Sequence, residues 1–221
     1  MRIRIPFEIT AQDAIALQNR LAPLVAQHTD LPEKVAGLVG CDATYFNGST
    51  VAAATLVNYK SLNALRARLV RERTRFPYVP GLLAFREGPA VLRAVRALRA
   101  KSYVCLVDAH GIAHPRRFGL ACFVGLALNR PTIGVAKSLL CGVTEGDFVL
   151  DEEGRRLAEI VPLPDSKKVI YVSVGHKVSL KDAVMIVKRC LNARGPIPIN
   201  LAHDQVTKQK WEIKKSNQAF S

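Results

Sequence analysis

The stretch Tyr103–Gly119, YVCLVDAHGIAHPRRFG, decides how the fold of this 221-residue chain is predicted. It opens with a short apolar run containing β-branched side chains, which predicts a buried strand. The run delivers Asp108 to the carboxyl end of that strand, where open α/β sheets usually place their ligand sites. His114 and two arginines follow in a connecting segment, and such segments often carry function. The same residues also fit a helix-capping aspartate followed by a solvated basic turn.

Length and composition predict one soluble domain, residues 1–221, with a polyanionic partner. Lys plus Arg total 32 against 18 Asp plus Glu, a formal net charge of +14 that favours nucleic acid or an anionic membrane surface. No apolar run reaches the roughly 20 residues of a spanning helix, and the start MRIRIPFEIT has no signal-peptide core. The cysteines lack CxxC spacing and are expected to be reduced core residues. We therefore expect a cytoplasmic protein without membrane contact.

The first third of the chain predicts a helix and then an antiparallel hairpin. Apolar residues at helical spacing indicate a helix over Asp13–Gln27. An apolar strand, Val35–Cys41, would end at Asp42. The pair Asn47-Gly48 favours a tight hairpin turn into a returning strand, Val51–Tyr59.

The next segment is harder to assign from its pattern. Leu62–Arg73 mixes basic and apolar residues and fits either an alternating edge strand or a short helix; we favour the strand. Two prolines bracket Tyr78 and Val79, which predicts a stiff loop that cannot be a central strand. Gly88-Pro89 then indicates a break before a helix over Ala90–Lys101.

Alternating helices and strands follow the central strand. Leu120–Leu128 is wholly apolar and predicts a buried helix, and Thr132–Val135 predicts a short strand. Lys168–Val174 and a stretch around Val178 indicate another strand pair. Asp182 is expected to cap a helix that runs to Cys190 or Leu191. This order of elements favours an α/β fold with a mixed sheet.

In such a sheet Asp42 and Asp108 could lie side by side at adjacent strand ends. Two carboxylates placed so closely repel each other unless a cation lies between them, and oxygen ligands of this kind suit Mg²⁺ or Mn²⁺. Glu87, close to the proline-bracketed loop, is a plausible third ligand. A cation at this position would polarise a phosphodiester and help generate hydroxide from water.

Lys137 and His114 would add donors at the same edge of the sheet. Lys137 could orient a nucleophilic water or offset phosphate charge, whereas His114 could assist proton transfer or contact the phosphate. Each residue also has a plain structural interpretation, as a surface charge and as a structural hydrogen-bonding group.

Four segments, in this order, resemble the endonuclease V family: VGCDATY, FPYVPGLLAFREGP, VDAHGIAHPRRFGLA and IGVAKS. The resemblance runs from about Val39 to Ser138. It implies an α/β, ribonuclease-H-like mixed β-sheet flanked by helices. It also implies a DNA repair endonuclease that uses Mg²⁺, with Mn²⁺ able to substitute, and that cuts the second phosphodiester bond 3′ to hypoxanthine, so that DNA containing deoxyinosine is the expected partner.

The resemblance also assigns residues. It implies metal ligation by Asp42, Glu87 and Asp108, with His114, Lys137 and His203 as supporting catalytic groups. His203 lies in a weakly matching segment, and from spacing alone Asp204 is an equally credible ligand. The substrate-binding residues that it implies are a wedge loop, Pro77, Tyr78, Val79 and Pro80, and a base pocket with Gly81, Leu83, Gly111 and Ala136.

The chain departs from the family pattern at two places. The family commonly has Gly after the second Asp, whereas Ala109 and the bulkier His110 stand here, and a Cβ at that position narrows the approach of backbone to a ligand. Phe123 occupies a position where relatives often have His, so a polar role there is not expected.

Other functions remain open from the sequence. The same family features fit an inosine-specific ribonuclease. A non-catalytic nucleic-acid-binding protein of the same fold is disfavoured because all three acidic residues are present. A resolvase-like or transposase-like nuclease would share the chemistry, and the proline-bracketed loop argues against it.

Overall fold

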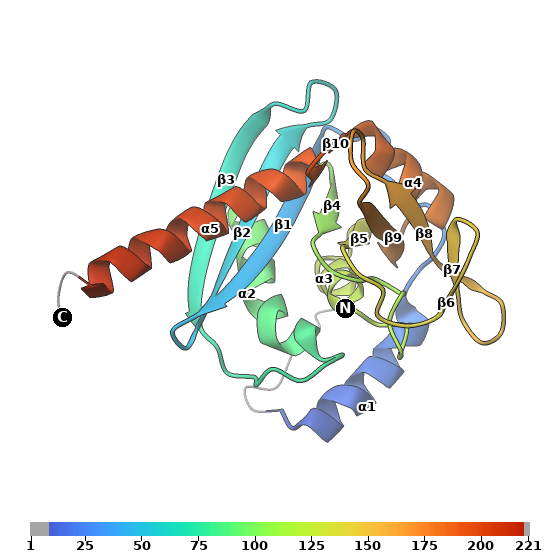
Figure 1. The fold of residues 1–221 in the computed structure, drawn as a ribbon, viewed down its shortest axis with the longest axis horizontal. Coiled ribbons are helices and arrows are strands. Elements are labelled where there is room, and N and C mark those ends of the chain that lie inside the picture. The colour runs from blue at the N-terminus through green and yellow to red at the C-terminus, as the bar shows by residue number, and fades with distance from the viewer. Residues whose placement is uncertain (1–8, 219–221) are drawn as a thin grey trace.

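The computed structural model describes residues 9–218 and is built on a nine-stranded mixed sheet in the order β3-β2-β1-β4-β5-β9-β8-β7-β6 (Figure 1). The strands of this sheet are β1 Gly37–Phe46, β2 Ser49–Asn58, β3 Ala64–Arg73, β4 Tyr103–Val107, β5 Thr132–Ala136, β6 Val143–Glu145, β7 Phe148–Leu150, β8 Arg156–Pro162 and β9 Val169–His176. The helices are α1 Ala11–Leu21, α2 Leu83–Ala97, α3 Leu120–Leu128, α4 Leu180–Arg189 and α5 Ile197–Gln218. A short ribbon joins β10 Leu191–Asn192 to β11 Gly195–Pro196. The predicted α/β fold class is confirmed.

The sheet combines an antiparallel meander with a parallel centre. β1, β2 and β3 pair antiparallel, β4 and β5 run parallel to β1, and β9 returns antiparallel to β5. The turn between β1 and β2 has positive φ at both Asn47 (45°) and Gly48 (71°), as a two-residue type I′ hairpin requires. The hairpin and the edge strand β3 were both predicted correctly.

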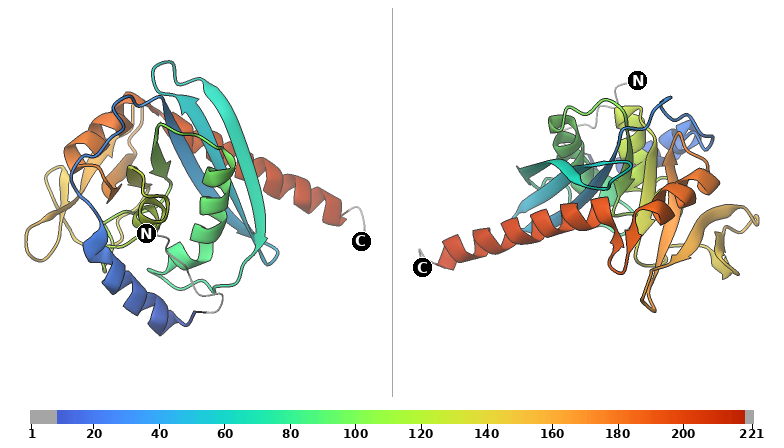
Figure 2. Two further views of the ribbon diagram at one scale, coloured as in Figure 1. Left: turned by 180° about the vertical axis from the view of Figure 1, so that it is seen from behind. Right: turned by 90° about the horizontal axis from the view of Figure 1, so that it is seen from above.

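Helices cover both faces of the meander. α5 crosses the front of β1 and β2 in Figure 1, and the view from behind in Figure 2 shows α2 on the opposite face. α5 also projects beyond the rest of the molecule (Figure 2). No helix within residues 9–218 combines the length and apolar character needed to cross a membrane. The prediction that the start of the chain has no signal-peptide core concerns mainly residues 1–8, which lie outside the described residues.

The neighbouring strands β1 and β4 end at different points, and this places the acidic residues. The last parallel pair is Cys41 with Val107, after which β4 stops, whereas β1 continues to Phe46 because β2 goes on pairing with it. The expectation that Asp42 ends its strand is therefore wrong, since it lies inside β1. It is nevertheless the first β1 residue beyond the end of β4, and so it stands beside Asp108.

Glu87 lies within a helix rather than before one. α2 begins at Leu83, whereas the sequence predicted a start at Ala90. Pro89 is accommodated inside the helix. Gly88 is required by packing, because a Cβ there would come within 2.4 Å of the Phe123 ring. Phe123, fully buried, fills the space against α2, which explains an apolar side chain at that position.

The other errors of prediction lie in the N-terminal helix and in the part of the chain after β5. The N-terminal helix stops at Leu21 and tightens into a 3-10 turn that contains Pro23, which cannot donate a backbone hydrogen bond. The expected strand around Val178 is absent from the described residues, where this position is loop. Ser179, not Asp182, caps α4, and its side chain accepts the Asp182 N–H. The short strands β6, β7 and β8 and the helix α5 were not predicted.

Candidate active site

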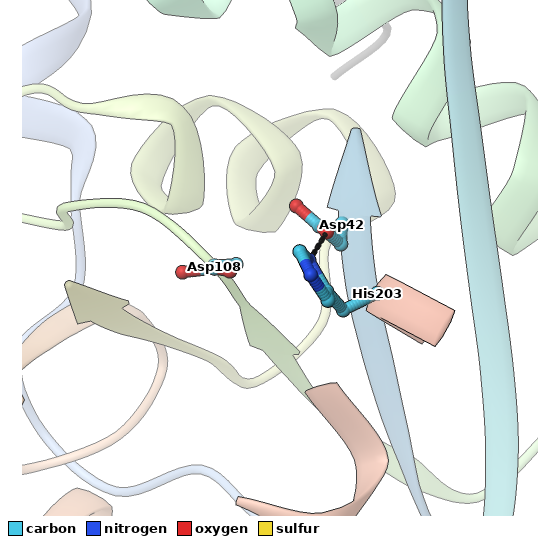
Figure 3. Close-up of side chains that lie close together, drawn as sticks. All are labelled: Asp42, Asp108 and His203. Carbon is cyan, nitrogen blue, oxygen red and sulfur yellow. Dashed lines mark hydrogen bonds and ion pairs between the residues drawn. The ribbon is translucent and has the colours of Figure 1, made fainter. Parts of the chain in front are cut away.

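Asp42, Asp108 and His203 converge where β4 ends (Figure 3), and one potential ligand atom from each lies within 4.8 Å of the others. His203 Nδ1 donates a hydrogen bond to Asp42 Oδ2 at 2.8 Å. The two aspartate side chains are only 11% and 12% exposed, whereas that of His203 is 48% exposed. The three side chains therefore form a partly open acidic cluster.

Close packing of α5 on β1 brings His203 over this cluster. A Cβ at Gly40 would lie 2.0 Å from the Pro198 backbone, so only glycine allows the start of α5 to approach this closely. Asp42 faces α5, because its partner across the strands, Ala53, packs in the apolar cluster beneath that helix. Gly40, two residues before Asp42, was the sequence signal for this close approach.

Negative charge accumulates around the cluster. Burial, followed by the charge of Asp108, raises the pKa of Asp42, while the hydrogen bond from His203 opposes that rise. Burial raises the pKa of Glu87 to about 8, with further contributions from Asp42 and Asp108. Glu87 is not one of the three clustered side chains, but the negative charges of both aspartates raise its pKa. Lys137, just after β5, supplies a counter-charge through its Nζ, 2.5 Å from Asp108 Oδ2.

This set of donors fits a hard divalent cation. Closely spaced carboxylate oxygens are the ligands that Mg²⁺ and Mn²⁺ prefer, and an imidazole nitrogen is also compatible with Mn²⁺. Burial first, and then the neighbouring negative charges, raise the pKa values of Asp42 and Glu87, and a bound cation would offset both effects. Asp42 and Asp108 are the core of the candidate metal site.

A cavity of about 150 Å³ lies beside the loop that connects β3 to α2. Its lining includes Tyr78, Val79, Pro80, Gly81 and Leu83 from that loop and the start of α2. Tyr78 is 72% exposed, so its ring is free to meet a ligand at the mouth of the cavity. Pro77, exposed at the base of the loop, is not among the lining residues.

Ala109 and His110, the departures from the family pattern, also line the cavity, and His110 Nε2 lies 2.9 Å from the Ser138 carbonyl. Gly111 and Ala136 do not line it. Gly111 donates its N–H to Ser173 Oγ at 2.8 Å, and a Cβ on it would lie 2.0 Å from the Val174 carbonyl. Gly111 is therefore packed against β9.

Two remaining candidates lie away from the cluster. Asp204 forms an ion pair with Arg194, with a nitrogen–oxygen distance of 2.5 Å, and is absent from the clustered ligands. His114 is buried, and both of its ring nitrogens are engaged by Gly81 and Arg116. Sequence reasoning missed Gln18, a fully buried residue of α1 whose side-chain amide donates a hydrogen bond to the Gly81 carbonyl. A lone glutamine on an amphipathic helix does not indicate that it holds the backbone in this way.

Fold and site together define a class: an α/β protein of ribonuclease-H-like fold with an acidic cluster at the end of its central strand β4. The sequence profile of the endonuclease V family matches residues 19–204. The chain belongs to the endonuclease V family, and it is by membership a nuclease.

Individual relatives agree with this assignment. Endonuclease V of Desulfurococcus amylolyticus is 38% identical over 201 residues, covering 86% of this chain and 91% of the relative. The crystal structure of endonuclease V from Streptomyces avermitilis superposes with a TM-score of 0.87 at 31% identity, covering 96% of this chain and 98% of that one. The Ciona intestinalis endonuclease V, solved with a 24mer DNA containing an inosine followed by a ribo-adenosine, gives a TM-score of 0.83 at 29% identity, covering 90% and 96% of the two chains.

Proposed function

We propose that this protein is a metal-dependent DNA repair endonuclease that recognises hypoxanthine and hydrolyses the second phosphodiester bond on its 3′ side. The observation that carries the proposal is the pairing of Asp42 with Asp108 at the end of β4, on a chain whose net charge is +14. A basic surface suits a polyanionic substrate, and a carboxylate pair suits the cation that phosphodiester hydrolysis uses. The inosine-containing DNA bound by the Ciona intestinalis relative supports the choice of substrate.

Asp42 and Asp108, joined by Glu87, would hold Mg²⁺, with Mn²⁺ able to substitute. Bound there, the ion would supply Lewis-acid polarisation of the scissile phosphate and a lowered pKa for water. His203 orients Asp42 through its Nδ1, and the position of Lys137 next to Asp108 lets its ammonium group offset phosphate charge or orient the nucleophilic water.

The loop Pro77–Pro80 would act as a wedge beside the lesion. Its prolines restrict the free chain and so lower the entropy lost when the loop is ordered, and the exposed Tyr78 ring offers a flat face that replaces lost base stacking. The turned-out base would enter the neighbouring cavity, whose lining includes Gly81 and Leu83. Gly111 and Ala136 do not line the cavity. They would contribute to base binding only by supporting the backbone of the residues that do.

The test uses end-labelled duplexes that contain deoxyinosine, deoxyuridine or no lesion, incubated with protein and Mg²⁺ and mapped at nucleotide resolution. We expect a nick at the second linkage 3′ to inosine, abolished by chelation. Matched inosine-containing RNA separates the ribonuclease alternative, which predicts cleavage of RNA alone. Binding to the inosine duplex without cleavage in Mg²⁺ or Mn²⁺ would overturn the catalytic assignment.

A cytoplasmic location and the single-domain organisation of residues 1–221 remain predictions from the sequence.

A further inference from the structure

The Gly81 carbonyl, where the wedge loop ends, accepts hydrogen bonds from three side chains. Gln18 Nε2 reaches it at 3.0 Å, His114 Nε2 at 2.9 Å and Arg116 Nη2 at 2.8 Å. A carbonyl oxygen has two lone pairs, so this acceptor is saturated. The three donors come from α1 and from the segment after β4. We call these three side chains and the Gly81 carbonyl the Gly81 clamp.

Gln18 is fully buried, and its amide is completely used. Arg116 Nε donates to Gln18 Oε1 at 2.6 Å. A guanidinium group can only donate, so this contact fixes which amide atom is the oxygen. The opposite atom, Nε2, then serves the Gly81 carbonyl and the Phe118 carbonyl, the latter at 2.8 Å. A buried amide satisfied in this way holds one geometry, because any other orientation would leave polar atoms unpaired.

His114 is held as one neutral tautomer. The Arg116 backbone N–H donates to Nδ1 at 3.1 Å, so Nδ1 carries no proton and the hydrogen is on Nε2, facing the Gly81 carbonyl. Burial lowers the pKa of His114 to about 4. Protonating Nδ1 would break its bond with Arg116. Both ring nitrogens are therefore committed to holding the backbone.

The clamped residue is the third residue of a tight turn. The Leu82 N–H donates to the Val79 carbonyl at 3.0 Å, Pro80 occupies the second position and Gly81 has φ +77°. Pro at the second position and Gly at the third is the sequence preference of a type II turn. A Cβ at Gly81 would also lie 2.7 Å from Arg116 Nη2. The turn joins the wedge loop directly to α2, which carries Glu87.

We propose that Gln18, His114 and Arg116 are positioning residues that fix the Gly81 peptide, and so preorganise the wedge and the base pocket before nucleic acid binds. This inference rests on the proposed function for its substrate, and it gives His114 a positioning role in place of proton transfer. A preorganised loop raises selectivity, because less ordering is needed when the lesion is engaged.

Substitutions at His114 separate positioning from acid–base catalysis. In His114→Gln the amide nitrogen can still donate to the Gly81 carbonyl, whereas His114→Ala removes the donor. We expect single-turnover cleavage by His114→Gln within about threefold of wild type, and a loss of about 10-fold or more for His114→Ala. Equal losses of about 10²- to 10⁴-fold in both variants would instead identify His114 as an acid–base group and overturn the proposal.

Arg116 and Arg117 provide a matched pair in one loop. Arg117→Gln removes the same charge as Arg116→Gln, but the Arg117 side chain is directed to Asp151, with which it forms an ion pair at 2.8 Å. Only Arg116→Gln should reduce the preference for inosine-containing over undamaged duplex, by about 10-fold. Equal reductions in both variants would show a charge effect and contradict the clamp.

Hydrogen exchange of the free protein tests the clamp without substrate. In Arg116→Gln and Gln18→Met the amides of the peptide covering residues 76–85 should exchange faster than in wild type. A β9 peptide serves as the internal reference for exchange, and the thermal unfolding midpoint of Arg117→Gln serves as the reference for overall stability. Unchanged exchange at residues 76–85 in both clamp variants would overturn the inference. An inactive wild type with the expected exchange pattern would instead refute the proposed function and leave the clamp standing.

Discussion

The acidic cluster of Asp42, Asp108 and His203 and the Gly81 clamp both gather polar side chains from distant parts of the chain. They differ in whether charges and hydrogen-bonding groups are balanced within the protein. In the cluster, the charge of Asp108 contributes to the raised pKa of Asp42, and both aspartates act on Glu87. In the clamp, the side-chain amide of Gln18 donates to two carbonyl groups. His114 donates one hydrogen bond through Nε2 and accepts one at Nδ1. The cluster therefore holds carboxyl groups whose pKa values are raised by burial and by neighbouring negative charge, whereas the hydrogen bonds of the clamp are complete in the free protein.

Removing one carboxylate of the cluster should have the largest effect. Asp42→Asn and Asp108→Asn are each expected to reduce cleavage of inosine-containing DNA by about 10³-fold or more, because electrostatic stabilisation of the reacting phosphate is lost. Binding should be largely retained, since the net charge of +14 is expected to supply most of the attraction to phosphates. Asp204→Asn is the control, because Asp204 pairs with Arg194 outside the cluster. Undiminished cleavage by both cluster variants would remove these aspartates from the active site.

Divalent cations should stabilise the wild-type protein. At a concentration 100 times the dissociation constant, Mn²⁺ is expected to add about 2.7 kcal/mol to the free energy of unfolding. Asp108→Asn should lose most of this gain, and Arg116→Gln should retain it, because the clamp holds no ion. Thermal unfolding with increasing Mn²⁺ measures the shift. An equal gain in wild type and Asp108→Asn would place the ion elsewhere.

The wedge should contribute to lesion recognition more than to general affinity. Tyr78→Ala is expected to weaken binding of inosine-containing duplex by about 1–3 kcal/mol, the usual value of one base–aromatic stack. Trp211→Ala, which removes another exposed aromatic ring on α5, is the control. Titration of both variants against damaged and undamaged duplexes measures the difference. Equal losses of Tyr78→Ala on the two duplexes would argue against a wedge.

Acid should weaken the fold through histidines held neutral by packing. His176 accepts the Ala26 N–H at Nδ1, and burial lowers its pKa to about 4. The unfolded chain takes up this proton near pH 6.5, so it binds more protons than the folded state between these values. The stabilisation is therefore complete above about pH 6.5 and is lost as the pH falls towards 4.

The expected loss is about 1–3 kcal/mol for His176. His176→Asn keeps an acceptor for Ala26 and does not titrate, so the difference in unfolding free energy between variant and wild type should change over this pH range. Denaturant unfolding at pH 7, 5.5 and 4.5 provides the values. A difference that does not vary with pH would show that His176 titrates normally in the folded protein.

The parts of the fold that local sequence determines were predicted well. The run before Asp108 forms β4, Asn47-Gly48 forms the hairpin turn, and Leu120–Leu128 is a helix with the predicted bounds. In each case the local apolar pattern or turn chemistry agrees with the tertiary environment.

The errors arose where partners distant in sequence decide the structure. β1 continues past Asp42 because β2 pairs with it. α2 begins before Gly88, directly after a turn whose Gly81 carbonyl is held by Gln18, His114 and Arg116 from distant parts of the chain. α5 is held by the apolar cluster that Ala202 and Val206 form with β2 and by the close packing of its first turn on Gly40. Periodicity within a single segment reports none of these interactions.

The structure brings together three of the residues that the sequence proposed for the site, and their roles remain predictions. Asp42, Asp108 and His203 could be selected by residue type and motif, because carboxylates and imidazoles are the side chains that commonly ligate metals. Gln18 could not, since its role depends on a carbonyl 63 residues later in the chain. Neutral hydrogen-bond networks of this kind become visible only when the backbone geometry is known.

The most direct test measures cleavage rate and binding preference together on Asp108→Asn and Arg116→Gln, with one inosine-containing duplex and its undamaged match. We predict that Asp108→Asn stops cleavage while keeping the preference for inosine, and that Arg116→Gln loses much of that preference while keeping Mg²⁺-dependent cleavage. If both variants lose both properties in the same proportion while remaining folded, the separation of a cation-binding cluster from a selectivity clamp is contradicted.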